Sequence, residues 1–166
     1  MADVRIVSHA DLHGTFADWM LTPLGTLDEK EELINAIKVA LMTDALADPD
    51  EILPDPDATD RRGWWGDYDA FPIWGGWPLG CKNWLLTRAK ISDSFSFEGA
   101  TLQRAEDYTR IAMRPFLDNK LASRIEVMAS RIGLERIEVL ITVYRGPKDA
   151  IELRFQSLWA DFIAGN

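Results

Sequence analysis

Residues 124–157 have the sequence RIEVMASRIGLERIEVLITVYRGPKDAIELRFQS, and this run determines the expected fold. Apolar and polar side chains alternate within it in three segments, which are separated at Gly133 and at Gly146-Pro147. A period of two turns one face of a strand toward a core and the other face toward water. Short breaks between such segments join neighbouring strands in antiparallel order. The run therefore predicts a three-stranded antiparallel meander.

A first long helix is expected over about residues 28–45. Thr26 stands three residues before Glu29, which is the spacing of a capping box, and acidic residues fill the first turns, where the helix dipole favours them. Apolar residues then recur at helical spacing from Leu33 to Leu41. One face of this helix is therefore expected to be buried.

A second long helix is expected over about residues 101–114, kinked or restarted at Pro115, with a last turn that reaches about Lys120. Residues 81–88 predict a short helix, and residues 1–25 predict a loose hairpin or arm. The expected fold class is α+β, with two main helices and an aromatic-rich loop packed on the C-terminal three-stranded meander. In this division residues 1–25 form the N-terminal arm or hairpin, and residues 26–166 form a single α+β domain.

Composition narrows the classes of function. The 166 residues include 18 basic and 27 acidic side chains, for a formal charge of −9, and 47% of the residues are hydrophobic. A chain of this composition can bury a hydrophobic core. Its net charge is negative, whereas a free-standing nucleic-acid binder is expected to have a positive one. The single cysteine, Cys81, excludes an internal disulfide, and two histidines give little support to a metal centre. No signal peptide or membrane span is recognised, so a soluble protein made in a reducing cytoplasm is expected.

The segment 44–60, named here the acidic segment, contains seven acidic residues, no basic residue and three prolines. Proline fixes its own backbone and lacks a donor, so an extended loop is expected. The string DPDATD resembles a calcium loop only weakly, because it lacks the glycine at the sixth position and the distal glutamate of an EF-hand. A solvated acidic loop is the expected structure.

Residues 61–80, RRGWWGDYDAFPIWGGWPLG, are rich in tryptophan and glycine and are named here the tryptophan loop. Glycine permits tight backbone shapes, and tryptophan offers a large apolar face with one donor. The tryptophans are expected either to pin an irregular loop or to serve as interface anchors, since tryptophan and arginine often dominate binding energy. The candidate partner-binding residues in the loop are Arg61, Arg62, Trp64, Trp65, Trp74 and Trp77.

Catalytic motifs are weak in this sequence. No nucleophile elbow, phosphate loop, dinucleotide fingerprint or zincin helix is present. The one carboxylate pair to consider is Asp67 and Asp69, beside aromatic residues that could stack on sugars. A cell-wall glycan hydrolase or glycan-binding module that uses the tryptophan loop is therefore the alternative function. A generic cytosolic interaction module is a third possibility.

The expected meander has two open edges, and a neighbouring chain can add a strand to such an edge. An acidic chain with an aromatic loop, an exposed sheet edge and no recognised catalytic motif is typical of an assembly component. We therefore expect a protein that binds other proteins, without enzymatic activity and without a cofactor.

Three strings in the chain resemble a known family. They are DATDRRGWWGD at 57–67, GCKNWLLTRAK at 80–90 and LASRIEV at 121–127, the last of which precedes a pair of C-terminal strands. Their order is similar to that of the Mu-like phage baseplate wedge proteins, whose distant relatives are the small, lysozyme-like wedge proteins of contractile tails. The resemblance covers about residues 11–160.

The resemblance implies a structural role in the tail baseplate of a virion that is assembled in the host cytoplasm. It implies larger wedge subunits and the tail sheath protein as partners, with central hub or tube proteins as a further contact, and no nucleic acid or membrane. In the distant relatives an E-P-R triplet at the start of the first meander strand contacts wedge helices. Arg124 occupies the position of that arginine, whereas Ala122 and Ser123 replace the other two residues. An Arg124 that simply faces solvent is the alternative.

Overall fold

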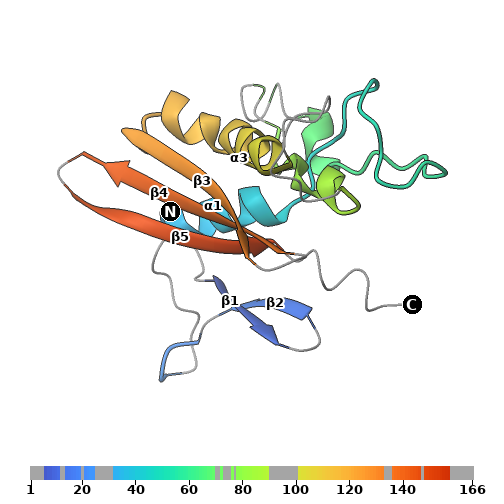
Figure 1. Cartoon of the computed structure of the whole chain (residues 1–166). Coiled ribbons are helices and arrows are strands. Elements are labelled where there is room, and N and C mark those ends of the chain that lie inside the picture. The colour runs from blue at the N-terminus through green and yellow to red at the C-terminus, as the bar shows by residue number, and fades with distance from the viewer. Residues whose placement is uncertain are drawn as a thin grey trace.

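The computed structural model describes residues 6–11, 14–19, 21–24, 32–69, 72, 76, 78–89, 101–132, 136–146 and 148–157. The expected α+β class is confirmed (Figure 1). The elements in chain order are β1 (Ile6–Asp11), β2 (Gly14–Trp19), α1 (Glu32–Met42), the 3-10 helices η1 (Trp65–Asp69) and η2 (Lys82–Leu86), α3 (Thr101–Asp118), β3 (Arg124–Ile132), β4 (Arg136–Arg145) and β5 (Lys148–Ser157).

The sheet that carries the core has the strand order β3-β4-β5. All pairs are antiparallel, with Val127 opposite Ile141 and Ile141 opposite Leu153. The apolar positions of the period-two pattern lie on one face, where Val127 and alternate residues of β4 from Ile137 to Val143 are buried. The alternation predicted for β3 and β4 is thereby confirmed.

The two long helices pack on this apolar face. Ile37 of α1, together with Met113 and Phe116 of α3, joins the sheet residues in one buried cluster. Each fully buried side chain of this size stabilises the fold by roughly 1.5 to 3 kcal/mol. Pro115 lies inside α3, and the helix continues past it to Asp118. None of the described helices is long and apolar enough to cross a membrane.

The helix α1 ends at Met42, earlier than expected, because the chain then forms a bridge with a distant segment. Asp44 and Cys81 pair as an isolated parallel bridge, in which Cys81 N–H donates to Thr43 O at 2.8 Å and Ala45 N–H donates to Cys81 O at 3.1 Å. The predicted cap at Thr26 lies outside the described residues. This bridge fixes the two ends of the segment that contains the acidic residues and the tryptophan loop.

A second, smaller cluster lies beside the main core. Trp84 and Leu85 of η2 pack with Ala47, while Leu53 and Tyr108 cover them. The acidic segment thus packs over η2 and α3. In the tryptophan loop, Leu79 packs against the main core, but residues 61–63 contact the acidic segment rather than the sheet, which differs from the packing expected for the loop.

At the N-terminus, β1 and β2 pair in antiparallel order, with Ile6 opposite Trp19. A hairpin was expected in this part of the chain. The division into an arm of residues 1–25 and a domain of residues 26–166 stays a prediction.

Candidate partner-binding surfaces

Arg61 fastens the tryptophan loop to the acidic segment. Its Nη1 donates to the carbonyl oxygens of Asp48 and Glu51, the latter at 3.3 Å, and its Nη2 donates to Pro49 O at 2.9 Å. A planar guanidinium can serve several acceptors at once, which a single ammonium does less well. Arg61 therefore has a structural role within the chain, and its contact with a partner stays a prediction.

Arg62 is bound on the same side of the loop. Its backbone is left-handed, with φ of 54°, and its N–H donates to Asp60 Oδ1 at 2.8 Å. Its Nη1 lies 2.6 Å from Asp44 Oδ2, and its guanidinium lies 4.6 Å from the centre of the Trp84 ring. The ion pair and the cation–π contact hold a backbone conformation that non-glycine residues rarely adopt.

Lys82 forms ion pairs with two carboxylates of the acidic segment. Its Nζ lies 2.6 Å from Asp48 Oδ2 and 2.8 Å from Glu51 Oε2. Burial lowers the pKa of Lys82, but the hydrogen bonds and charges of these two carboxylates outweigh it, so the net pKa lies above its ordinary value. The prediction of a simply solvated loop is therefore wrong for this part of the segment. Across the described residues, no group of three or more potential metal ligands is found.

The tryptophans fall into different environments. Trp84 is 7% exposed and its indole N–H donates to Ala45 O at 2.8 Å, whereas Trp65 is 84% exposed. The half-buried Trp64 ring covers Gly66 so closely that a Cβ at that position would lie 2.3 Å from ring carbons. Trp74 and Trp77 lie outside the described residues. Trp65 thus projects into solvent, whereas Trp64, the other described tryptophan of the loop, is half-buried against Gly66.

The two carboxylates of the glycan alternative belong to η1. Asp67 Oδ1 accepts the backbone N–H of Leu79 at 2.9 Å, and Asp67 N–H donates to Trp64 O. Asp67 therefore connects η1 to the C-terminal end of the tryptophan loop, which is a structural role. Asp69 is exposed.

A second surface, named here the strand-start surface, comprises residues 117–124 and 144–146, where α3 leads into β3. The helix ends in a Schellman motif: Leu121 N–H donates to Phe116 O, Lys120 N–H donates to Leu117 O, and Lys120 is left-handed with φ of 58°. This sharp end reverses the chain into the sheet.

Ser123 joins the start of β3 to the end of β4. Its N–H and Oγ–H both donate to Tyr144 O, at 2.8 and 2.9 Å, and its Oγ accepts the N–H of Gly146 at 3.1 Å. The register of β5 against β4 shifts between Val143 and Arg145, so Ser123 stabilises the strand end at an irregularity. The residue that replaces proline in the predicted triplet is thus bound within the chain.

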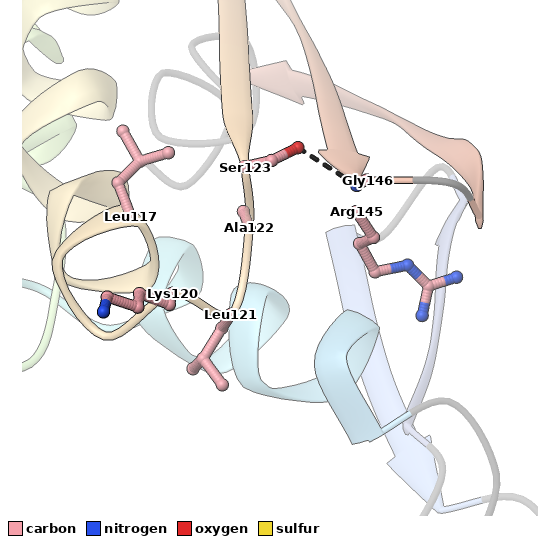
Figure 2. Close-up of a pocket in the computed structure, with 7 residues that line it drawn as sticks. All are labelled: Leu117, Lys120, Leu121, Ala122, Ser123, Arg145 and Gly146. Atoms are coloured by element: carbon pink, nitrogen blue, oxygen red, sulfur yellow. Dashed lines mark hydrogen bonds between the residues drawn. The ribbon is translucent and has the colours of Figure 1, made fainter.

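An open pocket of about 620 Å³ lies beside this connection (Figure 2). Figure 2 shows residues from the end of α3, from the turn and from the end of β4 around it. Its lining combines apolar side chains with two cations, because it comprises Leu117, Lys120, Leu121, Ala122, Ser123, Arg145 and Gly146. Leu117 and Leu121 are exposed, and the Nε of Arg145 is buried with no hydrogen-bond partner. The pocket can take an apolar side chain beside a carboxylate or a carbonyl group.

Arg124 is the first residue of β3 and lies next to this pocket. Its side chain is 59% exposed. The guanidinium lies 3.9 Å from the centre of the Tyr144 ring and 3.4 Å from Glu126 Oε1, and Tyr144 Oη donates to Glu126 Oε2 at 3.0 Å. The guanidinium is therefore oriented by a ring and a carboxylate while much of its surface faces outward. Its contact with a partner stays a prediction.

One edge of the sheet is occupied by α3. Glu106 Oε1 accepts the N–H of Ala129 at 2.9 Å, and Arg110 Nη2 donates to Val127 O at 3.2 Å. Glu106 and Arg110 also form an ion pair at 2.5 Å. The prediction of two open edges is therefore wrong at this part of β3, because side chains of the same chain take the groups that an added strand would use.

Sequence reasoning missed several residues of the strand-start surface. Tyr144 becomes a neighbour of Arg124 through the β3–β4 register, in which the two residues lie opposite each other, whereas Glu126 follows Arg124 by two positions on the same strand. The alternation of the two strands could have placed Tyr144 and Arg124 on one face. The left-handed backbone of Lys120 could not be predicted from the sequence, since the residue at this position of a helix end is usually glycine or asparagine.

Comparison with known proteins was decisive for the family. Residues 33–150 match the family described as phage protein GP46. The chain belongs to this family. A relative, the baseplate protein gp46 of Escherichia phage Mu, is 32% identical over 102 residues, which are 61% of this chain and 62% of the relative. The chain thus matches less than two thirds of that relative's length. The resemblance to Mu-like baseplate proteins is confirmed.

Proposed function

We propose that this protein is a structural component of a phage tail baseplate. Its family membership over residues 33–150 and the name of its Mu relative support this role. Within the baseplate, the protein joins larger wedge subunits to the first ring of sheath subunits and helps to initiate sheath assembly. It resides in the virion tail, is assembled in the host cytoplasm, and has no catalytic function.

The strand-start surface is the proposed contact with the wedge subunits. Arg124 is held by Tyr144 and Glu126, so little side-chain freedom remains to be lost on binding. The neighbouring pocket offers Leu117 and Leu121 beside two cations. A helix that ends in carbonyl groups, or one that carries a carboxylate among apolar residues, would complement this surface. Arg124 and the pocket thus support binding to wedge helices.

The sheet is the proposed contact with the sheath. Because Glu106 and Arg110 occupy the edge of β3, we place any added strand along β5. Central hub or tube proteins are a further proposed contact. Trp64 and the other tryptophan-loop candidates are secondary in this proposal, because Arg61 and Arg62 are bound within the chain.

The test is recovery of the tagged chain from a lysate that produces whole tails, with mass spectrometry of the proteins that accompany it. The wild-type chain is expected to bring large wedge and sheath subunits with it. Arg124→Ala is expected to lose them and to keep its melting temperature. Arg136→Ala is the matched control, since Arg136 is an exposed arginine at the start of β4, opposite the far end of β3.

Recovery of the chain alone, from a lysate with intact tails, would contradict the baseplate role. The glycan alternative is tested separately by turbidity of a peptidoglycan suspension. Clearing that Asp69→Asn abolishes would replace the structural proposal with an enzymatic one. We expect no clearing, since Asp67 is bound to the backbone of Leu79.

A further inference from the structure

Two aromatic side chains of η1 are almost fully exposed to solvent. Trp65 is 84% exposed and Tyr68 is 95% exposed. They are three residues apart in a 3-10 helix, where residues i and i+3 lie on the same side. Large exposed aromatic side chains in one place mark an interaction surface more often than a free surface.

The backbone beneath these rings is firmly held. Asp67 bonds to Leu79, the Trp64 ring covers Gly66, and the Trp64 and Trp65 rings lie 5.4 Å apart at 48°. Arg61 fastens the start of the loop to the carbonyl groups of the acidic segment. The rings are therefore presented by a preorganised loop, and a partner would pay little entropy to order it.

The segment that contains the two rings has an excess of negative charge. Residues 44–69 contain nine carboxylates and two arginines, and both arginines are bound within the chain. Lys82 and Arg88 also pair with carboxylates of this segment, at Asp48, Glu51 and Asp55, so an excess of five negative charges remains. Among the exposed carboxylates of this region are Asp50, Asp57 and Asp69. A surface of this sign attracts a basic partner and repels an acidic one. A second copy of this chain is disfavoured, because each copy has a formal charge of −9.

We propose that Trp65 and Tyr68 bind a basic segment of another tail subunit. Lysine or arginine side chains of the partner stack on the two rings and pair with exposed carboxylates of residues 44–69, of which Asp69 lies on η1 with the rings. The inference rests on the proposed baseplate role and assigns a second contact surface, separate in sequence from the strand-start surface. It also explains why the loop is so heavily braced around side chains that the fold leaves in solvent.

The test places a photo-crosslinker in the full chain within tail-producing cells. Tyr68→p-benzoylphenylalanine is compared with the same replacement of Met128, an exposed apolar residue of β3. After irradiation and purification of tails, the cross-linked peptides are identified by mass spectrometry. We expect position 68 to capture a peptide of net positive charge from another tail subunit, and position 128 not to capture that peptide.

A cross-link to a second copy of this chain, or to an acidic or uncharged peptide, would overturn the inference. So would the lack of any cross-link at position 68 in tails that contain the chain, and this result would leave the baseplate role intact. Absence of the chain from purified tails would contradict both proposals. The two failures are thus distinguishable in one sample.

Substitutions give an independent measure. The double variant Trp65→Ala/Tyr68→Ala is expected to keep its melting temperature and to reduce the amount of chain per tail roughly tenfold, as for loss of an interface hot spot. The variant Asp50→Asn/Asp57→Asn/Asp69→Asn is expected to weaken incorporation in low salt and to match wild type in high salt. Wild-type incorporation by both variants would overturn the inference.

Discussion

The tryptophan loop and the strand-start surface contain the same unusual backbone feature but use it differently. Among the described residues, the non-glycine residues with positive φ are Arg62 and Lys120, one in each region. Arg62 is held by Asp44 and by the Trp84 ring, so its side chain stabilises the fold. Lys120 is exposed and lines the pocket of Figure 2.

The difference shows how a strained residue can serve either stability or binding. A left-handed non-glycine residue costs about 1 to 2 kcal/mol. In the tryptophan loop, intrachain contacts of the same residue offset that cost. At the strand-start surface the offset comes from the backbone alone, because Lys120 N–H donates to Leu117 O in the Schellman motif. The side chain of Arg62 therefore stabilises the tryptophan loop, whereas the side chain of Lys120 is exposed and is available for the contact that we propose at the strand-start surface.

The largest expected effect comes from the base of the tryptophan loop. In Gly80→Ala, the new Cβ would lie 2.7 Å from Ala45 N, and φ of 121° would be strained. Steric overlap with backbone cannot relax cheaply, so we expect a loss of about 3 kcal/mol in the free energy of unfolding, measured by urea denaturation.

The matched control is Gly146→Ala at the strand-start surface. Its φ of 67° is also positive, but no atom lies within 4 Å of the added Cβ. A loss of about 1 kcal/mol is expected there. Equal losses at the two glycines would show that close packing does not hold the loop base.

The pH dependence of stability tests the packing around Cys81, which follows Gly80 at the end of the tryptophan loop. Burial raises the pKa of its thiol from 9.0 to about 11, against smaller opposing effects of hydrogen bonds. Because the folded state holds the proton more tightly, the contribution to stability is complete below pH 9 and is lost as the pH rises through 11. We expect a loss on the order of 2 kcal/mol relative to Cys81→Ala over that range, measured by urea denaturation. Parallel curves for the two proteins would contradict this.

The arginines provide the next comparison. Arg61→Ala removes the bonds to the Asp48, Pro49 and Glu51 carbonyl groups, and we expect it to cost about 1.5 kcal/mol. Arg124→Ala is expected to cost less than about 0.5 kcal/mol, because its side chain is exposed. Thermal melts with calorimetry measure both. A greater loss for Arg124 than for Arg61 would reverse their assigned roles.

The smallest expected effect is a gain. Lys120→Gly relieves the left-handed backbone without loss of an intrachain contact known for that side chain, so stability rises by about 0.5 to 1 kcal/mol. Arg62→Gly relieves the same strain but removes an ion pair and a ring contact, so we expect no gain. Denaturation midpoints of the two variants measure the difference, and a gain for both would remove the contrast between the regions.

Sequence patterns predicted the regular parts of this molecule well. The alternation that begins at Arg124 predicted the strands β3 and β4 and their buried face, because successive side chains of a strand point to opposite faces of the sheet. The helix predicted from residue 101 to about residue 120 is likewise present as α3, which continues past Pro115 to Asp118. These predictions succeeded because each rests on neighbours within a few residues.

The irregular parts could not be predicted in this way. Trp64 and Trp65 are adjacent, yet Trp64 covers Gly66 and Trp65 faces water. An irregular loop has no hydrophobic periodicity, so its sequence does not indicate which side chains point toward the protein. The bonds of Arg61, the ion pairs of Lys82 and the contact of Glu106 with Ala129 join residues 10 to 34 positions apart. Such pairs depend on tertiary packing, so they become visible only in the structure.

The contact of Glu106 and Arg110 with β3 also has a consequence for the protein before it reaches a particle. Continuous growth of a sheet from copy to copy requires two accessible edges on each copy. Because Glu106 and Arg110 occupy backbone groups in the middle of β3, we expect the strand addition proposed at β5 to end after a single partner. We therefore expect newly made chains to resist fibre formation at high concentration, since one of the two sheet edges that a fibre needs is occupied within each chain.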